Sequence, residues 1–155
     1  MKTIKGPAIF LAQFMDEKAP YNSLDGLCKW ASDLGYKGIQ MPTLDTRLIN
    51  LKTAAESQTY CDALLGKINS YGLELTELST HIQGQLVAVH PAHDMMFDVF
   101  APDKLRGKPI ERTAWAIQEM KYAAMASRRL NLKAHATFSG SLLWPMMHPW
   151  PQQPQ

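Results

Sequence analysis

The stretch "LGYKGIQMPT", residues 34–43, shows how this chain passes from a helix into a strand. A glycine ends a segment with apolar residues at helical spacing, and an apolar run that stops at a proline follows it. The same junction recurs in "YGLELTELSTH" (71–81) and "LNLKAHATF" (130–138), and the residues in matching places are Gly35, Gly72 and Asn131. Gly and Asn best tolerate the left-handed conformation that ends a helix. The recurrence predicts a repeated helix–strand unit.

The segments around these junctions alternate between strand and helix patterns. Short apolar runs bounded by Gly or Pro predict strands, and apolar residues three or four apart predict helices. The resulting order β-α-β-α-β-α-β predicts an α/β protein with a parallel sheet and right-handed crossovers. Strands are expected over 6–14, 36–43, 73–81 and 132–138, and helices over 22–35, 54–72 and 109–130.

Two architectures fit this order, a doubly wound open sheet and part of a (β/α) TIM barrel. A doubly wound nucleotide-binding sheet usually has a glycine-rich loop after its first strand, but here "MDEKAPYN" (15–22) follows. A complete barrel takes about 250 residues. Four strands in 155 residues therefore predict half a barrel, forming a single domain over residues 1–155.

Composition and charge exclude several classes of protein. The apolar content of 46% predicts a globular core, and the net charge of +2 without a basic run argues against nucleic acid as a partner. No stretch is long enough to predict a membrane span. Cys28 and Cys61 fall within expected helices, so we expect no disulfide framework and a reducing compartment, the cytoplasm.

Polar side chains gather where the expected strands end. Chemistry in parallel α/β sheets sits at the carboxyl ends of the strands. If all these side chains face inward, they converge on one pocket; the simpler alternative is that strand ends are polar because they meet water. The residues, strand by strand, are Gln13, then Gln40, then Glu77, Ser79 and His81, then His135 and Thr137.

A long insertion, residues 82–108, separates the third strand from the third helix. Long connections in compact domains are usually functional or disordered, and the Val, Phe and Met content here predicts an ordered lid. His90 and His93 could form a metal pair, but Pro91 lies between them and no zinc motif surrounds them. We therefore expect these two histidines to be structural.

Three segments resemble the sugar phosphate isomerase/epimerase family of xylose-isomerase-like TIM barrels. They are "SLDGLCKWASDLGYKGIQMPT" (23–43), "LELTELSTHIQGQLVAVHP" (73–91) and "AHATFSGSLLWPMMHPWPQ" (134–152). The resemblance implies isomerisation or epimerisation of a sugar or polyol with a divalent metal such as Mn, Mg, Zn or Co. The alternatives are an endonuclease-IV-type nuclease on the same fold and a non-catalytic interaction module.

The resemblance also implies roles for particular residues. His81 and His135 would be catalytic, and Gln83 and Trp144 would contact the substrate together with Gln13 and Gln40 at the strand ends. Family members continue into a second half, where most of their metal ligands lie. We therefore expect this chain to carry only the N-terminal half of the site, without the metal ligands. The unpaired edges of a half barrel would favour association of two copies.

Overall fold

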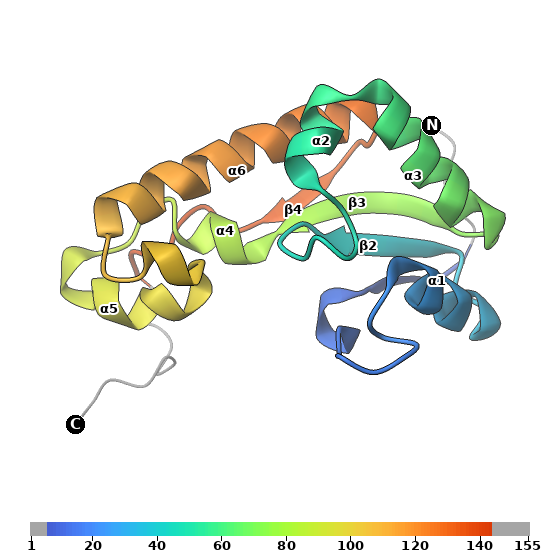
Figure 1. Ribbon diagram of the computed structural model, residues 1–155, viewed down its shortest axis with the longest axis horizontal. Coiled ribbons are helices and arrows are strands. Elements are labelled where there is room, and N and C mark those ends of the chain that lie inside the picture. The colour runs from blue at the N-terminus through green and yellow to red at the C-terminus, as the bar shows by residue number, and fades with distance from the viewer. Residues whose placement is uncertain (1–5, 144–155) are drawn as a thin grey trace. The chain divides into compact units, whose positions relative to one another are not determined.

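The computed structural model describes residues 6–143, which form an α/β fold (Figure 1). Its four-stranded parallel sheet has the order β1-β2-β3-β4, so sequence neighbours are also neighbours in the sheet. The predicted parallel α/β fold is confirmed. The strands are β1 (Ala8–Phe10), β2 (Gly38–Pro42), β3 (Glu74–Thr80) and β4 (His135–Thr137).

The helices follow the predicted order with one correction. The single helix expected over 54–72 is two helices, because Ser57 has extended backbone angles (φ −125°, ψ 118°) and its side chain accepts a hydrogen bond from the Tyr60 amide. Ser57 thus ends one helix and caps the next. The α-helices are α1 (Leu24–Asp33), α2 (Leu51–Glu56), α3 (Gln58–Ser70), α4 (His81–Gln85), α5 (Asp94–Phe97) and α6 (Pro109–Arg129).

The three helix–strand junctions have the backbone conformation that the sequence predicts. Gly35, Gly72 and Asn131 have φ values of 86°, 73° and 54°, all in the left-handed region. Asn131 is the one non-glycine residue with positive φ among residues 6–143. The repeated junction in the sequence is therefore a repeated helix stop in the structure.

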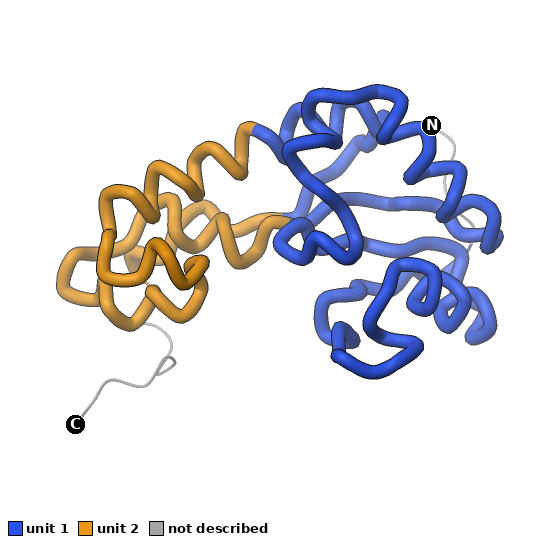
Figure 2. The backbone as a smooth tube through the Cα atoms, viewed as in Figure 1, with its two compact units in different colours: residues 1–79, 122–136 blue, residues 80–121, 137–155 orange. Residues whose placement is uncertain are grey.

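Figure 2 shows that the chain divides into two compact units. The sheet unit comprises residues 1–79 and 122–136, and the loop unit comprises residues 80–121 and 137–155. The prediction of one domain over the whole chain stays a prediction. Within residues 6–143, no helix is both long and apolar enough to cross a bilayer.

The core of the sheet unit lies on one face of the sheet. On β2 and β3, Ile39, Met41 and Leu78 point to this face and are fully buried. α1, α3 and the end of α6 pack apolar side chains into the same cluster, among them Leu27, Ala31, Ile68, Ala126 and Leu130. The helices therefore share a single face of the sheet, and residues of opposite phase, such as Gln40, lie on the other.

The loop unit folds most of the predicted lid around a small core and a buried cation. Arg112 of α6 is fully buried, and its Nη atoms lie 2.5 Å from Asp94 Oδ1 and 2.7 Å from Asp98 Oδ1. The backbone oxygen of Asp94 accepts a further bond of 2.8 Å. This network ties α5 and the 3-10 helix after it to α6. The apolar core consists of Leu86, Phe97, Ala101, Leu105 and Ala116.

Candidate functional site

Gln40 and Glu77 form a polar pair on the sheet face that the helices leave open. They lie opposite each other on β2 and β3, and the Gln40 amide Nε2 donates to Glu77 Oε1. Both side chains are partly exposed. Phe10 of β1 is in register with Gln40 and adds an aromatic ring to this face. The pair combines a carboxylate acceptor with an oriented amide, which suits binding of hydroxyl groups.

A β-bulge puts Glu77 on this face. The pairing of Ile39 with Leu75 is followed directly by the pairing of Gln40 with Glu77, so Thr76 is the extra residue. The Thr76 hydroxyl donates to the Ile39 carbonyl at 3.0 Å, which fixes the irregularity. In an unbroken ladder Gln40 would pair with Thr76, and Glu77 would point into the helix-covered core. Bulges often re-aim a side chain next to a functional site.

His135 lies away from this pair. It is the first residue of β4, and its Nδ1 is 3.3 Å from the Ser127 hydroxyl on α6. Because α6 covers the core face of the sheet, His135 points toward the helices. Strand alternation predicted that His135 would face inward with Glu77, and the structure corrects that orientation. Its predicted catalytic role stays a prediction.

His81 starts α4 rather than ending β3, whose last residue is Thr80. Its imidazole packs against Phe138, with ring centroids 5.1 Å apart. The hydroxyl of the preceding residue, Thr80, donates to the Thr137 hydroxyl oxygen at 2.9 Å. The structure thus places the His81 ring against Phe138, as it places His135 Nδ1 near the Ser127 hydroxyl, and the predicted catalytic role of His81 stays a prediction.

Gln83 leads to a residue that the sequence analysis missed. It is 1% exposed, and its side chain hydrogen-bonds the carboxyl group of Glu119 on α6. Burial raises the pKa of Glu119, and the bond to Gln83 partly opposes that rise. An acidic residue on a long helix usually belongs to its solvated face, so no spacing pattern could single out Glu119.

Two predicted substrate contacts remain, Gln13 and Trp144. Gln13 lies in the 3-10 helix Ala12–Phe14 and is exposed, because β1 already ends at Phe10. Its expected position at a strand end is therefore wrong. Trp144 lies outside the described residues.

The cysteines and the loop histidines have structural environments. Burial raises the pKa of the Cys28 thiol to about 12, so it is not a thiolate at neutral pH. The Cys61 thiol donates to the Ala54 carbonyl at 3.2 Å. His90 Nδ1 accepts from the Ala92 amide at 3.2 Å and caps the 3-10 helix Pro91–His93.

The described residues do not by themselves form the metal centre that the resemblance implies. Over residues 6–143, no three or more His, Cys, Asp or Glu side chains come together closely enough to hold a metal ion. Zinc sites in proteins use three or four such ligands.

The fold and the open-face pair define a parallel α/β protein with a polar group at its sheet. No known protein-family model matches this chain, and no curated protein matches it either.

Proposed function

We propose that this chain is a sugar- or polyol-binding part of a TIM-barrel-type isomerase or epimerase of the xylose-isomerase-like kind. The observation that carries the proposal is the strand order β1-β2-β3-β4 with the helices on one face. Right-handed crossovers that always move in one direction put every helix on the same side. A doubly wound sheet instead reverses direction and has helices on both faces. The open face then corresponds to a barrel interior.

Gln40 and Glu77 would contact the substrate on this face. The Glu77 carboxylate can accept hydrogen bonds from sugar hydroxyls, and it can remove the proton from the carbon next to a carbonyl. Returning that proton to the former carbonyl carbon isomerises the sugar, provided that a proton also passes from the adjacent hydroxyl to the carbonyl oxygen. Epimerisation would need a second acid that protonates the same carbon from the opposite side. The hydrogen bond from Gln40 holds the carboxylate in one orientation. A divalent cation would need ligands beyond those that residues 6–143 bring together.

The histidines and Gln83 are not needed for this proposal. His81 and Gln83 belong to the loop unit, and their expected roles in catalysis and substrate binding stay predictions. The contact of His135 with Ser127 favours Glu77 over His135 as the proton-transfer group. The assignment therefore rests first on Glu77.

The sheet edges give a second part of the proposal. In the described structure β1 pairs only with β2, and β4 lies at the opposite edge. Exposed edges are templates for pairing with further strands. We propose that added strands, such as those of a second copy, cover them. In a two-fold arrangement, β4 of each copy would pair with β1 of its partner, and light scattering across a concentration series would detect the dimer.

Solvent-deuterium exchange tests the chemistry without requiring net conversion. The protein would be incubated in D₂O with aldoses, ketoses and their phosphates, with and without Mn²⁺, Mg²⁺, Co²⁺ or Zn²⁺. We expect deuterium at the carbon next to the carbonyl of at least one sugar. Glu77→Gln should slow exchange roughly 10²–10⁴-fold.

Glu74→Gln is the matched control for that substitution. Glu74 is on the same strand, pairs with Gly38 and is exposed at the amino end of β3. It should keep the full exchange rate. The isomerase proposal fails if no sugar exchanges under any condition, or if Glu77→Gln exchanges as fast as Glu74→Gln.

A further inference from the structure

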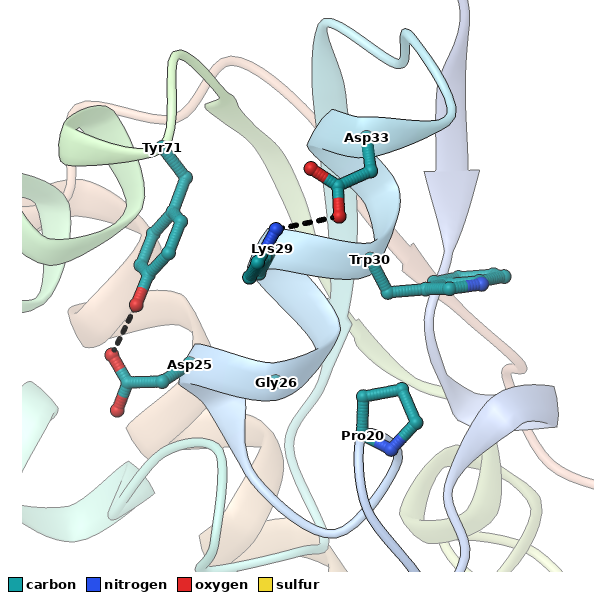
Figure 3. A pocket seen from close by; sticks show the side chains of 7 residues that line it. All are labelled: Pro20, Asp25, Gly26, Lys29, Trp30, Asp33 and Tyr71. Carbon is teal, nitrogen blue, oxygen red and sulfur yellow. Dashed lines mark hydrogen bonds and ion pairs between the residues drawn. The ribbon is translucent and has the colours of Figure 1, made fainter.

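The outer surface of α1 carries a groove of about 410 Å³ that the proposed site does not use. Figure 3 shows Lys29 in the middle of this groove, between Tyr71 and Trp30. The groove lies entirely within the sheet unit. Its lining consists of Pro20, Asp25, Gly26, Lys29, Trp30, Asp33 and Tyr71.

Close packing pre-forms one wall of the groove. A Cβ atom at Gly26 would lie 2.1 Å from the Pro20 carbonyl oxygen, so the backbone of the preceding loop rests directly on α1. Trp30 is held by aromatic neighbours, with its ring 4.7 Å from Phe14 and 5.5 Å from Tyr21. The indole is thus fixed beside the groove before any ligand arrives.

The polar groups of the groove come as donor–acceptor pairs. Lys29 Nζ lies 2.7 Å from Asp33 Oδ2, and the Tyr71 hydroxyl donates to Asp25 Oδ1 at 3.0 Å. The hydrogen bond from Lys67 lowers the pKa of Asp25, and the bond to Asp25 raises the pKa of Tyr71. At neutral pH the carboxylate therefore stays an acceptor and the phenol stays a donor.

A second hollow of about 320 Å³ continues this surface, because Asp25 lines both hollows. Lys67 Nζ lies 2.9 Å from Asp25 Oδ2 and also lines the second hollow. Arg47 and Tyr60 add further donors there. Asp25 thus lies where the two hollows adjoin, and a ligand longer than one ring could extend from one into the other.

We propose that these two hollows bind a short neutral oligosaccharide. A sugar ring has an apolar face that stacks on aromatic rings and a rim of hydroxyls that both donate and accept hydrogen bonds. The groove matches both features, with Trp30 and Tyr71 for the rings and the Lys29–Asp33 and Tyr71–Asp25 pairs for the hydroxyls. An isolated anion would meet Asp25 and Asp33, and an isolated cation would meet Lys29. The site is independent of the proposed isomerase chemistry.

Titration of the ¹⁵N-labelled full chain with cellotetraose and maltotetraose tests this proposal. We expect saturable chemical-shift changes at the Trp30 indole and at the amides of Asp25 and Lys29 with one of the two sugars. Lys29→Met and Asp25→Asn should each weaken binding roughly two- to tenfold, which corresponds to losing one or two net hydrogen bonds. Trp30→Phe should weaken binding less than Trp30→Leu, because the phenyl ring keeps an aromatic face.

Arg106→Gln is the matched control for the charge changes. It breaks an exposed pair with Asp103, 2.9 Å long, in the loop unit, and should bind saccharide like the original chain. Circular dichroism of each variant checks that it is folded. The proposal is overturned if neither sugar shifts these signals, if tetramethylammonium or phosphate alone does so, or if Lys29→Met and Arg106→Gln bind equally well.

Discussion

The sheet unit and the loop unit are stabilised by different kinds of interaction. In the sheet unit, helices α1, α2, α3 and α6 and strands β2 and β3 bury a continuous apolar cluster that includes Leu27, Ile39 and Leu78. In the loop unit, the apolar core is small, and the fully buried Arg112 is bonded to Asp94 and Asp98. Apolar burial is non-directional, whereas a buried ion pair depends on each partner being in place. The two units should therefore respond differently to single substitutions.

Arg112→Ala should cause the largest loss of stability, and that loss should be confined to the loop unit. Removing the guanidinium leaves two carboxylates with small exposed fractions, 26% for Asp94 and 17% for Asp98, without their cation. Breaking a buried ion pair on one side costs about 3–5 kcal/mol. Hydrogen exchange should show lost protection in residues 91–107, with the sheet strands protected as before. Arg128→Ala on the exposed side of α6 is the control, and equal protection in both variants would contradict the prediction.

Leu78→Ala should destabilise the sheet unit instead. Leu78 is fully buried between β3 and the helices, and a leucine truncated in a core costs about 2–4 kcal/mol, depending on how far the cavity collapses. Urea unfolding followed by circular dichroism measures the loss. Leu34→Ala is the control, since that side chain is 61% exposed. A Leu78→Ala protein as stable as Leu34→Ala would show that this cluster is not the main source of stability.

Two glycines sharpen the comparison further. A Cβ at Gly84 of α4 would lie 2.3 Å from the Phe138 carbonyl oxygen, so Gly84→Ala should cost about 1–3 kcal/mol through overpacking in the loop unit. Gly66 of α3 has no atom within 4 Å of that position, so Gly66→Ala should stabilise the sheet unit by about 0.5–1 kcal/mol. Melting temperatures should move in opposite directions. A rise in both would mean that helix propensity outweighs packing at Gly84, and a fall in both would contradict the prediction for Gly66.

Local signals in the sequence predict the helix–strand order well, and Gln40 and Glu77 share a face as expected, but the bulge that allows this and the orientation of His135 are not predicted. Gly35, Gly72 and Asn131 mark the helix ends because left-handed backbone is a property of residue type. The bulge at Thr76, which turns Glu77 to the open face, depends on a bond to the neighbouring strand that no local pattern records. The predicted direction of the His135 side chain is wrong for a related reason, because the face to which it points depends on where the short strand β4 begins.

Substitution of Glu119 should have the smallest effect on stability. It tests whether the free energy of unfolding of the loop unit depends on pH. Burial raises the pKa of Glu119, so the folded state holds this proton more tightly than the unfolded state does. Its contribution to stability is present below the unfolded pKa and is lost as pH rises through the folded pKa. Glu119→Gln cannot ionise, so it should be as stable as the original chain at pH 4 and more stable at pH 7, by less than about 1 kcal/mol for a half-buried group. Urea titrations at both pH values measure the difference, with Glu111→Gln at the exposed start of α6 as the control. A gain from Glu119→Gln that does not change with pH would mean that its carboxyl group is solvated in the folded protein.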